Sequence, residues 1–387
     1  MERDIYDEDH EAFRDVVKEF VKRYVTLADI ARWDADGEVD RDTMRAAGES
    51  GLIGLSVPEE FGGAGMLQDY RFRAVVNEEI IAAGAGSLAG AFGIQDDLAV
   101  PYLVHMGTDE QKQTWLPRMA TGEVIGALAM TEPGAGSDLR GIKTTAKKVD
   151  GGYIVNGAKT FISSGATADI VVTFVKTGEG DRPDAFSLLI IETASEGFDH
   201  GKKLHKMGFQ GHDTAELSFS DVFVPDANLI GGREGQGFVQ LMMNLPLERL
   251  SIGVAAAAAA QAGLDWTLTY TKEREAFGQR IIDFQNSRFA LADIATTVDA
   301  LWAYLDRALL AYRDGKLSAE EAAKVKFWAT EREWDVLDAC VQLHGGYGYI
   351  MEYPIARAFL DARVHRIYGG TNEIMREIVG RQLAGKR

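Results

Sequence analysis

The chain has 387 residues, of which 46% are hydrophobic and 26% charged, and its formal net charge is −18. This composition is typical of a globular protein of two or three domains. No run approaches the roughly 20 apolar residues of a membrane helix, so we expect no membrane span. The acidic balance disfavours nucleic acid as a partner. The single cysteine, Cys340, excludes an intrachain disulfide.

The start of the sequence and its first third indicate a helical region. Met1-Glu2-Arg3-Asp4-Ile5 resembles neither a secretory signal nor an organelle presequence, which predicts a cytoplasmic location. Apolar residues between Phe13 and Tyr24 recur at helical spacing, and 70–83 is a second stretch without proline or glycine. We expect an N-terminal helical domain over residues 1–124.

From residue 125 the pattern becomes that of strands. Short β-rich runs at 153–155, 170–175, 186–191 and 215–224 are separated by turn sequences such as Asp150-Gly151 and Asn156-Gly157. The glycine-rich segment 231–237 marks a boundary, so the β domain is expected over residues 125–232.

Long helical patterns return after residue 233, at 264–271, 289–313 and 319–344, and predict a C-terminal helical domain over 233–387. Strands grouped between two sets of helices, without strand–helix alternation, indicate an α+β fold and argue against a doubly wound parallel sheet.

Several common catalytic motifs are absent from the sequence. The nearest match to a dinucleotide-binding glycine loop, Gly84-Ala85-Gly86-Ser87-Leu88-Ala89, follows a helical pattern and not a strand. The sequence contains no P-loop, HExxH or GxSxG motif, and the seven histidines are scattered. We therefore expect no metal site.

Met130-Thr131-Glu132-Pro133-Gly134-Ala135-Gly136-Ser137-Asp138 is the segment most suited to ligand binding. Its glycines allow backbone amides to approach a ligand, and two hydroxyls suit a flavin edge or a pyrophosphate. A simple entry loop into the β domain is the alternative, and the residues alone favour it.

Five short sequence motifs, two of them in the β region, together resemble the acyl-CoA dehydrogenase family. MTEPGAGSD is followed at the expected distance by Lys159-Thr160-Phe161-Ile162-Ser163-Ser164-Gly165. Further on come Arg274-Glu275-Ala276-Phe277-Gly278, Gln342-Leu343-His344-Gly345-Gly346-Tyr347-Gly348-Tyr349 and Ile367-Tyr368-Gly369-Gly370-Thr371-Asn372-Glu373-Ile374. Their order and span make the resemblance more specific than any single loop. The runs Lys203-Leu204-His205-Lys206-Met207-Gly208 and Met351-Glu352-Tyr353-Pro354-Ile355-Ala356 resemble the long-chain branch of the family most.

The resemblance implies an N-terminal all-α domain, a middle β-barrel or sandwich, a C-terminal four-helix bundle, and FAD as cofactor. The residues implied around the isoalloxazine and the thioester are Leu128, Met130, Thr131, Ser137, Phe161, Ile162 and Ser163. Thr371, Asn372 and Glu373 would meet the cofactor within their own subunit. Phe161 and Leu128 stand where many members have tryptophan and another aromatic residue.

A second copy of the chain is implied for the adenosine half of FAD, which in the family is held by a neighbouring subunit. The residues that would do so are Arg274, Phe277, Gln285, Gln342, Gly345 and Gly346. The resemblance thus implies a homo-oligomer, expected to be a tetramer. Taken singly, these residues also suit structural roles, such as a helix C-cap at Gly345-Gly346.

The position of the catalytic base departs from most of the family. Most members carry glutamate in Tyr-Glu-Gly-Thr, where this chain has Tyr368-Gly369-Gly370-Thr371. In the isovaleryl-CoA and long-chain branches the base comes from the helix after the β domain, and Leu245-Pro246-Leu247-Glu248-Arg249-Leu250 matches that pattern. Glu248 is the predicted base, and burial is expected to raise its pKa. A glutamate favoured by the helix dipole is the alternative.

The remaining site predictions concern the substrate. The backbone N–H of Gly369 is expected to donate to the thioester oxygen. Substrate contacts are assigned to Ser137, Pro246, Leu247, Arg249, Gly369 and Gly370, with a structural ion pair as the alternative for Arg249.

The expected activity is FAD-dependent dehydrogenation of acyl-CoA in fatty-acid β-oxidation, with an electron-transfer flavoprotein as acceptor. Three alternatives stay open: an oxidase, an enzyme acting on carrier-protein-bound acyl groups, and a non-catalytic binding homologue.

Overall fold

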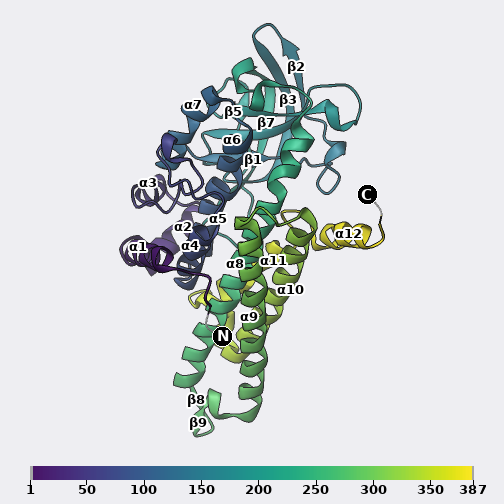
Figure 1. The fold of residues 1–387 in the computed structure, drawn as a ribbon. Coiled ribbons are helices and arrows are strands. Elements are labelled where there is room, and N and C mark those ends of the chain that lie inside the picture. The colour runs from purple at the N-terminus through teal and green to yellow at the C-terminus, as the bar shows by residue number, and fades with distance from the viewer. Residues whose placement is uncertain (1–2, 386–387) are drawn as a thin grey trace.

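The computed structural model describes residues 3–385, which form a helical region, a β region and a second helical region in chain order (Figure 1). The α+β fold class is therefore confirmed. One long helix, α8 (Gly237–Glu273), runs from the β region to the opposite end of the molecule. At 1.5 Å per residue it is about 55 Å long.

The N-terminal region places the helices beside α8 and the sheet. Side-chain oxygens of Asp7, Thr26 and Thr108 cap the first turns of three of them. The helices are α1 (Glu8–Tyr24), α2 (Leu27–Asp36), α3 (Arg41–Glu49), α4 (Arg71–Ala82), α5 (Gly86–Gly93), α6 (Val100–Met106) and α7 (Asp109–Ala120). A π-helical turn, η2 (Ile94–Ala99), joins α5 to α6.

The β region is one seven-stranded sheet with the order β1-β4-β2-β3-β7-β6 and with β5 paired to β4. Its strands are β1 (Gly126–Ala129), β2 (Thr145–Val149), β3 (Gly152–Ser163), β4 (Ile170–Lys176), β5 (Phe186–Glu192), β6 (Phe198–Asp199) and β7 (Thr214–Pro225). β4 is buried on both faces as far as Val175 and is correspondingly apolar, apart from the buried Thr173.

Strand β3 is longer than the sequence predicts. Turn-like Asn156-Gly157 lies inside it, because pairing with β7 continues past an irregularity at Val155 and Gly157. A second irregularity separates Lys159 from Ile162. Such bulges re-aim side chains, and this one leaves Phe161 exposed with φ +59°.

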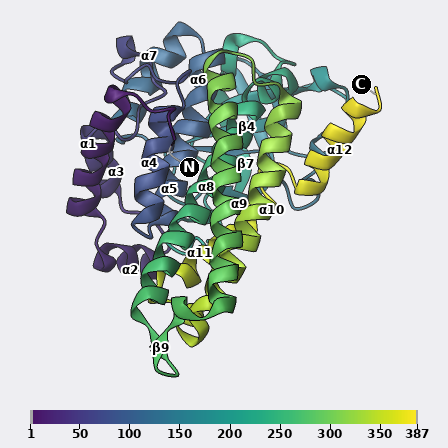
Figure 2. The same cartoon turned by 60° about the horizontal axis from the view of Figure 1, so that its bottom comes forward.

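The C-terminal region is a helical bundle with a projecting last helix. It contains α8, the short hairpin β8 (Glu275–Ala276) and β9 (Gln279–Arg280), α9 (Gln285–Arg313), α10 (Ala319–His344), α11 (Pro354–His365) and α12 (Asn372–Leu383). Figure 2 shows α8, α9 and α10 side by side, with α12 projecting beyond them. The hairpin lies at the far end of α8.

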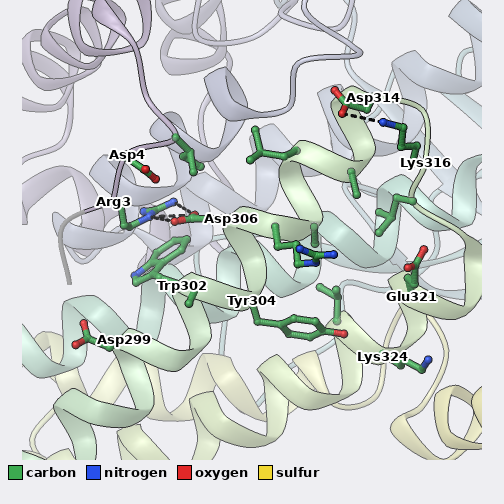
Figure 3. Close-up of a pocket in the computed structure, with 18 of the residues that line it drawn as sticks. Arg3, Asp4, Asp299, Trp302, Tyr304, Asp306, Asp314, Lys316, Glu321 and Lys324 are labelled. Carbon is green, nitrogen blue, oxygen red and sulfur yellow. Dashed lines mark hydrogen bonds and ion pairs between the residues drawn. The ribbon is translucent and has the colours of Figure 1, made fainter.

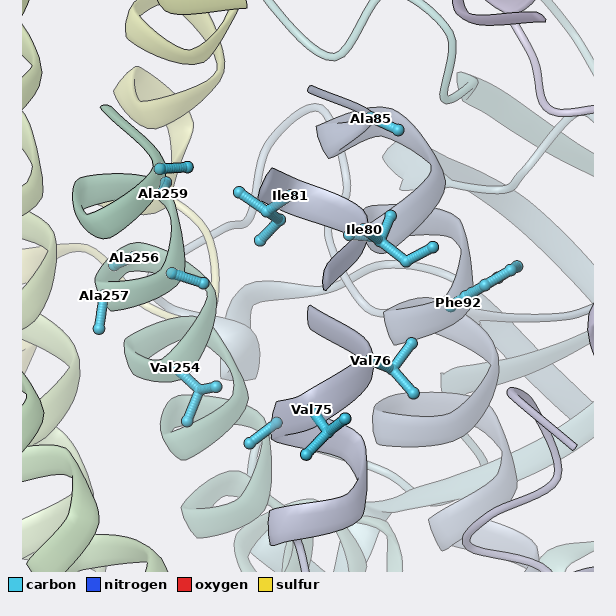
Figure 4. Packing of buried hydrophobic residues seen from close by; sticks show 14 of the residues in the cluster. Val75, Val76, Ile80, Ile81, Ala85, Phe92, Val254, Ala256, Ala257 and Ala259 are labelled. Carbon is cyan, nitrogen blue, oxygen red and sulfur yellow. The ribbon is translucent and has the colours of Figure 1, made fainter. Parts of the chain in front are cut away.

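The six-alanine run 255–260 packs in the interior. Ala256, Ala257 and Ala259 belong to the same buried cluster as Val75 and Ile81 of α4 (Figure 4). Small side chains let the two helix backbones approach closely. Within residues 3–385, no helix has the length and apolarity needed to cross a membrane.

Candidate active site

Glu248 lies on α8 inside the protein, with only 3% of its surface exposed. Tyr102 of α6, itself fully buried, donates a hydrogen bond of 2.8 Å from its hydroxyl to Glu248 Oε1. Burial disfavours the charged carboxylate and raises the pKa of Glu248 to about 7. The carboxyl group is thus suited to exchange a proton near neutral pH.

The glycine loop 368–371 lies against the same part of α8. Gly369 has φ +62°, and a Cβ built on it would come within 2.4 Å of Ile252 Cδ1. Ile252 follows Glu248 by one helical turn on the same helix face. The backbone of Gly369 therefore packs against the turn of α8 that follows Glu248.

Lys326 of α10 holds this loop through hydrogen bonds. Its ammonium group is fully buried and donates to the Gly370 carbonyl oxygen at 2.8 Å and to Asn372 Oδ1 at 2.9 Å. Burial lowers the pKa of Lys326 to about 7. Because Gly370 follows Gly369 directly, these contacts fix the backbone at the predicted N–H donor.

Arg249 is buried beside Glu248 and has unused hydrogen-bonding capacity. Its Nε has no hydrogen-bond partner, and the side chain makes no salt bridge within residues 3–385. The structural ion pair considered as its alternative role is therefore not observed. Of the three substrate contacts predicted on α8, Leu247 packs in the core and Pro246 is half-buried. Arg249 is the one of these three whose side chain has a hydrogen-bond donor to offer a ligand.

The loop 130–138 is held by a buried ion pair that the sequence analysis missed. Lys159 Nζ lies 3.0 Å from Glu132 Oε1 and also donates to the Met130 carbonyl oxygen at 3.0 Å. Glu132 in turn accepts from the backbone N–H groups of Lys143 and Thr144. This network explains why the two middle-region motifs occur together: each supplies one partner of the pair.

The residues assigned to the flavin ring differ in accessibility. Phe161 is 68% exposed, Ser137 is exposed, and Met130, Thr131 and Ser163 are half-buried. Leu128 and Ile162 have their side chains in the cores of the β region, which leaves mainly their backbone for ligand contacts. The Thr160 N–H donates to the Thr131 carbonyl oxygen at 2.9 Å, so the two segments lie side by side.

The residues assigned to the adenosine half gather at the other end of the molecule. Arg274 lies 5.9 Å from the ring centroid of Tyr347, which follows Gly345 and Gly346 directly. Phe277 projects from the β8–β9 hairpin with 96% exposure, while Gln285 and Gln342 are exposed. Gly345, with φ +58°, is also the C-cap of α10. Arg274 is 26 residues, or about 39 Å of helix, from Glu248.

Residues 371–373 begin α12. Thr371 caps it by accepting from the Ile374 N–H. The Asn372 side chain is buried and bonded to Lys326, Thr330 and Glu331, whereas Glu373 is exposed. Asn372 therefore maintains the loop, and the hydroxyl of Thr371 and the carboxylate of Glu373 lie nearer the surface.

A cavity of about 860 Å³ lies between the N-terminal segment, α9 and α10 (Figure 3). Arg3 spans one wall, paired with Asp306 and lying 3.7 Å from the ring centroid of Trp302. Both acidic and basic side chains line it, and it contains none of the predicted site residues. Within residues 3–385, no cluster of side chains could hold a metal ion.

Three family models match almost the whole chain. They are the acyl-CoA dehydrogenase N-terminal domain at residues 7–123, the middle domain at 127–222 and the C-terminal domain at 235–384. The chain belongs to the acyl-CoA dehydrogenase family. Members of this family are FAD-dependent oxidoreductases, so the predicted enzyme class and the FAD cofactor are confirmed.

Individual members of the family are similar to this chain over nearly its full length. Mouse mitochondrial long-chain specific acyl-CoA dehydrogenase is 41% identical, covering 98% of this chain and 88% of the relative. Potato mitochondrial isovaleryl-CoA dehydrogenase is 36% identical, covering 98% and 91%. A crystal structure of an acyl-CoA dehydrogenase from Geobacillus kaustophilus is 42% identical, covers 98% of both chains and has a TM-score of 0.93.

The residues of this acyl-CoA dehydrogenase family member fit its cofactor. Phe161 offers an exposed aromatic face on a backbone held at positive φ, a strained geometry that accumulates at functional sites. Thr131, Ser137 and Ser163 offer hydroxyls in the two adjoining segments. The isoalloxazine of FAD, an apolar ring system with a polar edge, matches this combination of an aromatic face and hydroxyl groups.

Proposed function

We propose that this chain dehydrogenates an acyl-CoA thioester to the trans-2-enoyl-CoA, with Glu248 as the base that removes the α-proton. FAD, when bound, supplies the acceptor for the hydride that leaves the β-carbon. The reaction belongs to fatty-acid β-oxidation or to the oxidation of branched acyl groups.

The observation that carries this proposal is the placement of Glu248. The carboxyl group is buried, its pKa is raised to about 7 by that burial, and Ile252, one turn further along α8, lies against Gly369. A glutamate placed only to suit the helix dipole would be expected near a helix end and in solvent. Glu248 lies well inside α8, after Pro246, and is 3% exposed.

The chain's own residues then have defined tasks. Glu248 accepts the α-proton in surroundings from which bulk water is excluded. The Gly369 N–H donates to the thioester carbonyl oxygen, where negative charge develops as that proton leaves. Lys326 holds the loop that carries this donor, and Arg249 offers its unpaired Nε to the CoA portion of the substrate.

Partners and assembly are proposed by resemblance and geometry. The two groups of residues assigned to one FAD lie at opposite ends of α8, so a second copy of the chain is needed to bring them to one cofactor. We propose a homotetramer, with an electron-transfer flavoprotein as electron acceptor. The relatives include mitochondrial enzymes, and a cytoplasmic location for this chain stays a prediction.

A carrier-protein-bound acyl thioester and a non-catalytic binding role are the rival functions. Anaerobic mixing of the purified holoprotein with a panel of acyl-CoAs, in wild type and Glu248→Gln, separates them. Bleaching of the flavin by one chain class, lost in the variant by a factor of about 10² to 10⁴, supports the proposal and measures the acyl range. The same acyl groups are also supplied as thioesters of a carrier protein. Bleaching only by these carrier-bound thioesters would support the first rival, and no bleaching by either kind of thioester would support the second.

A further inference from the structure

Two polar contacts join α6 to the segment of α8 that carries the base. Tyr102 donates to Glu248 Oε1 at 2.8 Å, and His105 Nδ1 lies 2.8 Å from Asn244 Oδ1. Tyr102 and His105 are three residues apart on α6, while Asn244 and Glu248 are four apart on α8, so each pair shares one helix face. The contacts form a short ladder between antiparallel helices.

The hydrogen bonds of the Glu248 carboxyl group are asymmetric. Oε1 accepts from Tyr102, whereas Oε2 has no hydrogen-bond partner within residues 3–385. A lone hydrogen bond to one oxygen fixes the plane and rotamer of a carboxyl group without consuming its other oxygen. The aromatic ring of Tyr102 is itself fully buried, so the donor has little freedom to move.

We infer that Tyr102 is a positioning residue, whose hydroxyl fixes Oε1 of Glu248 and leaves Oε2 to receive the substrate proton. This inference rests on the proposed role of Glu248 as base. A neutral donor serves this purpose better than a cation, because it orients the carboxylate without the strong fall in basicity that a close ion pair causes.

The charged groups around the pair do not replace this contact. On α8, Arg249 acts on Glu248 at longer range and makes no ion pair with it. Asp97 of η2 is held by Arg73, by the Tyr70 hydroxyl and by Ser251 of α8. Lys326 of α10 is directed to the Gly370 carbonyl oxygen. Tyr102 is the one group that donates to the carboxylate within residues 3–385.

The decisive variant is Tyr102→Phe, which keeps the ring and removes only the hydroxyl. Losing a donor to the carboxylate destabilises the charged form, so the pKa of Glu248 rises. The acidic limb of the kcat/KM profile should move to higher pH by about one unit or more, and the rate near pH 6.5 should fall about tenfold. Tyr153→Phe is the matched control, because the Tyr153 hydroxyl donates to Glu234 Oε1 at 2.7 Å in the β region.

A second readout uses the ligand-free protein. The carboxyl stretching band that disappears in Glu248→Gln reports the protonation of Glu248 in infrared difference spectra. Its titration should move to higher pH in Tyr102→Phe and stay unchanged in Tyr153→Phe. This readout needs no turnover, so it distinguishes failure of the inference from failure of the proposed function, which shows as wild-type flavin that no acyl-CoA bleaches.

Two results would overturn the inference. One is an unchanged carboxyl titration and pH profile in Tyr102→Phe. The other is a loss of activity without any shift of the acidic limb, accompanied by equal loss of FAD and thermal stability, which would show that Tyr102 acts only in packing.

Discussion

The side chain of Ile252 occupies the space that a side chain at Gly369 would need, since a Cβ there would lie 2.4 Å from Ile252 Cδ1. Ile252 and Glu248 share one face of α8. The proposed base on the helix and the glycine in the loop are therefore linked, because the helix face that carries Glu248 also fills the space that a loop side chain would require.

Gly369→Ala is expected to lower the free energy of unfolding by about 1 to 2 kcal/mol, because alanine is strained at φ +62° and its Cβ meets Ile252. Urea denaturation measures the loss. Gly151→Ala isolates the backbone part, since Gly151 has φ +73° and nothing within 4 Å of its Cβ position. Ile252→Val removes Cδ1 and should restore part of the loss in the double variant. Equal losses in the Gly369 and Gly151 variants would contradict the steric part.

Glu248 gives the folded protein a defined pH dependence of stability. Its pKa is about 7 when folded and about 4.5 when unfolded, so the folded state holds the extra proton between these values. Stability from this group is present below about pH 4.5 and is lost as pH rises through 7. The unfolding free energy of Glu248→Gln should therefore exceed that of wild type by about 3 kcal/mol at pH 8 and match it near pH 4.5.

Denaturant unfolding of both ligand-free proteins at the two pH values tests this. Glu60→Gln, at an exposed position, is the control for the substitution itself. A difference between wild type and Glu248→Gln that is independent of pH would contradict the assignment of a buried, titrating carboxyl group.

Lys326→Met tests the support of the loop. It removes the donor to the Gly370 carbonyl oxygen and to Asn372, so unfolding should become easier by about 2 kcal/mol. The displaced Gly369 N–H should lower kcat/KM by a factor of about 10². Lys324→Met, two residues earlier on α10 and paired with Glu320 near the surface, should change kcat/KM less than twofold. Steady-state kinetics and denaturation of both variants decide the matter.

The order of regions could be predicted from sequence because periodicity and turn residues are local signals. The β-rich run 170–175 appears as β4 (Ile170–Lys176). The full length of β3 was not predicted, because its pairing with β7 carries the strand through Asn156-Gly157, which read locally as a turn.

The candidate site was partly predictable for a similar reason. Glu248 and the glycine loop stand in recognisable strings, whereas Tyr102 and Lys326 act through partners that are 146 and 44 residues away along the chain. Neither residue is marked by a local pattern, because an apolar helix normally contains tyrosine and an amphipathic one contains lysine. The ion pair between Lys159 and Glu132 was not predicted for the same reason, although both residues stand in motifs that the sequence singles out.

Phe277 offers a test of the second copy of the chain. Its side chain is 96% exposed on the β8–β9 hairpin with φ +53°, and it touches only Phe284 among ring neighbours in residues 3–385. Phe277→Ala should leave the unfolding free energy of the isolated, ligand-free subunit within about 0.5 kcal/mol of wild type. In the assembled protein, the exposed ring is expected to contact the cofactor of a neighbouring subunit. The FAD content after purification and the fraction of tetramer in sedimentation velocity should therefore both fall.

The control is Leu27→Ala, at another exposed apolar residue (73%) on α2, which should alter neither quantity. Full FAD content and unchanged assembly in Phe277→Ala would show that the hairpin takes no part in binding the cofactor across subunits.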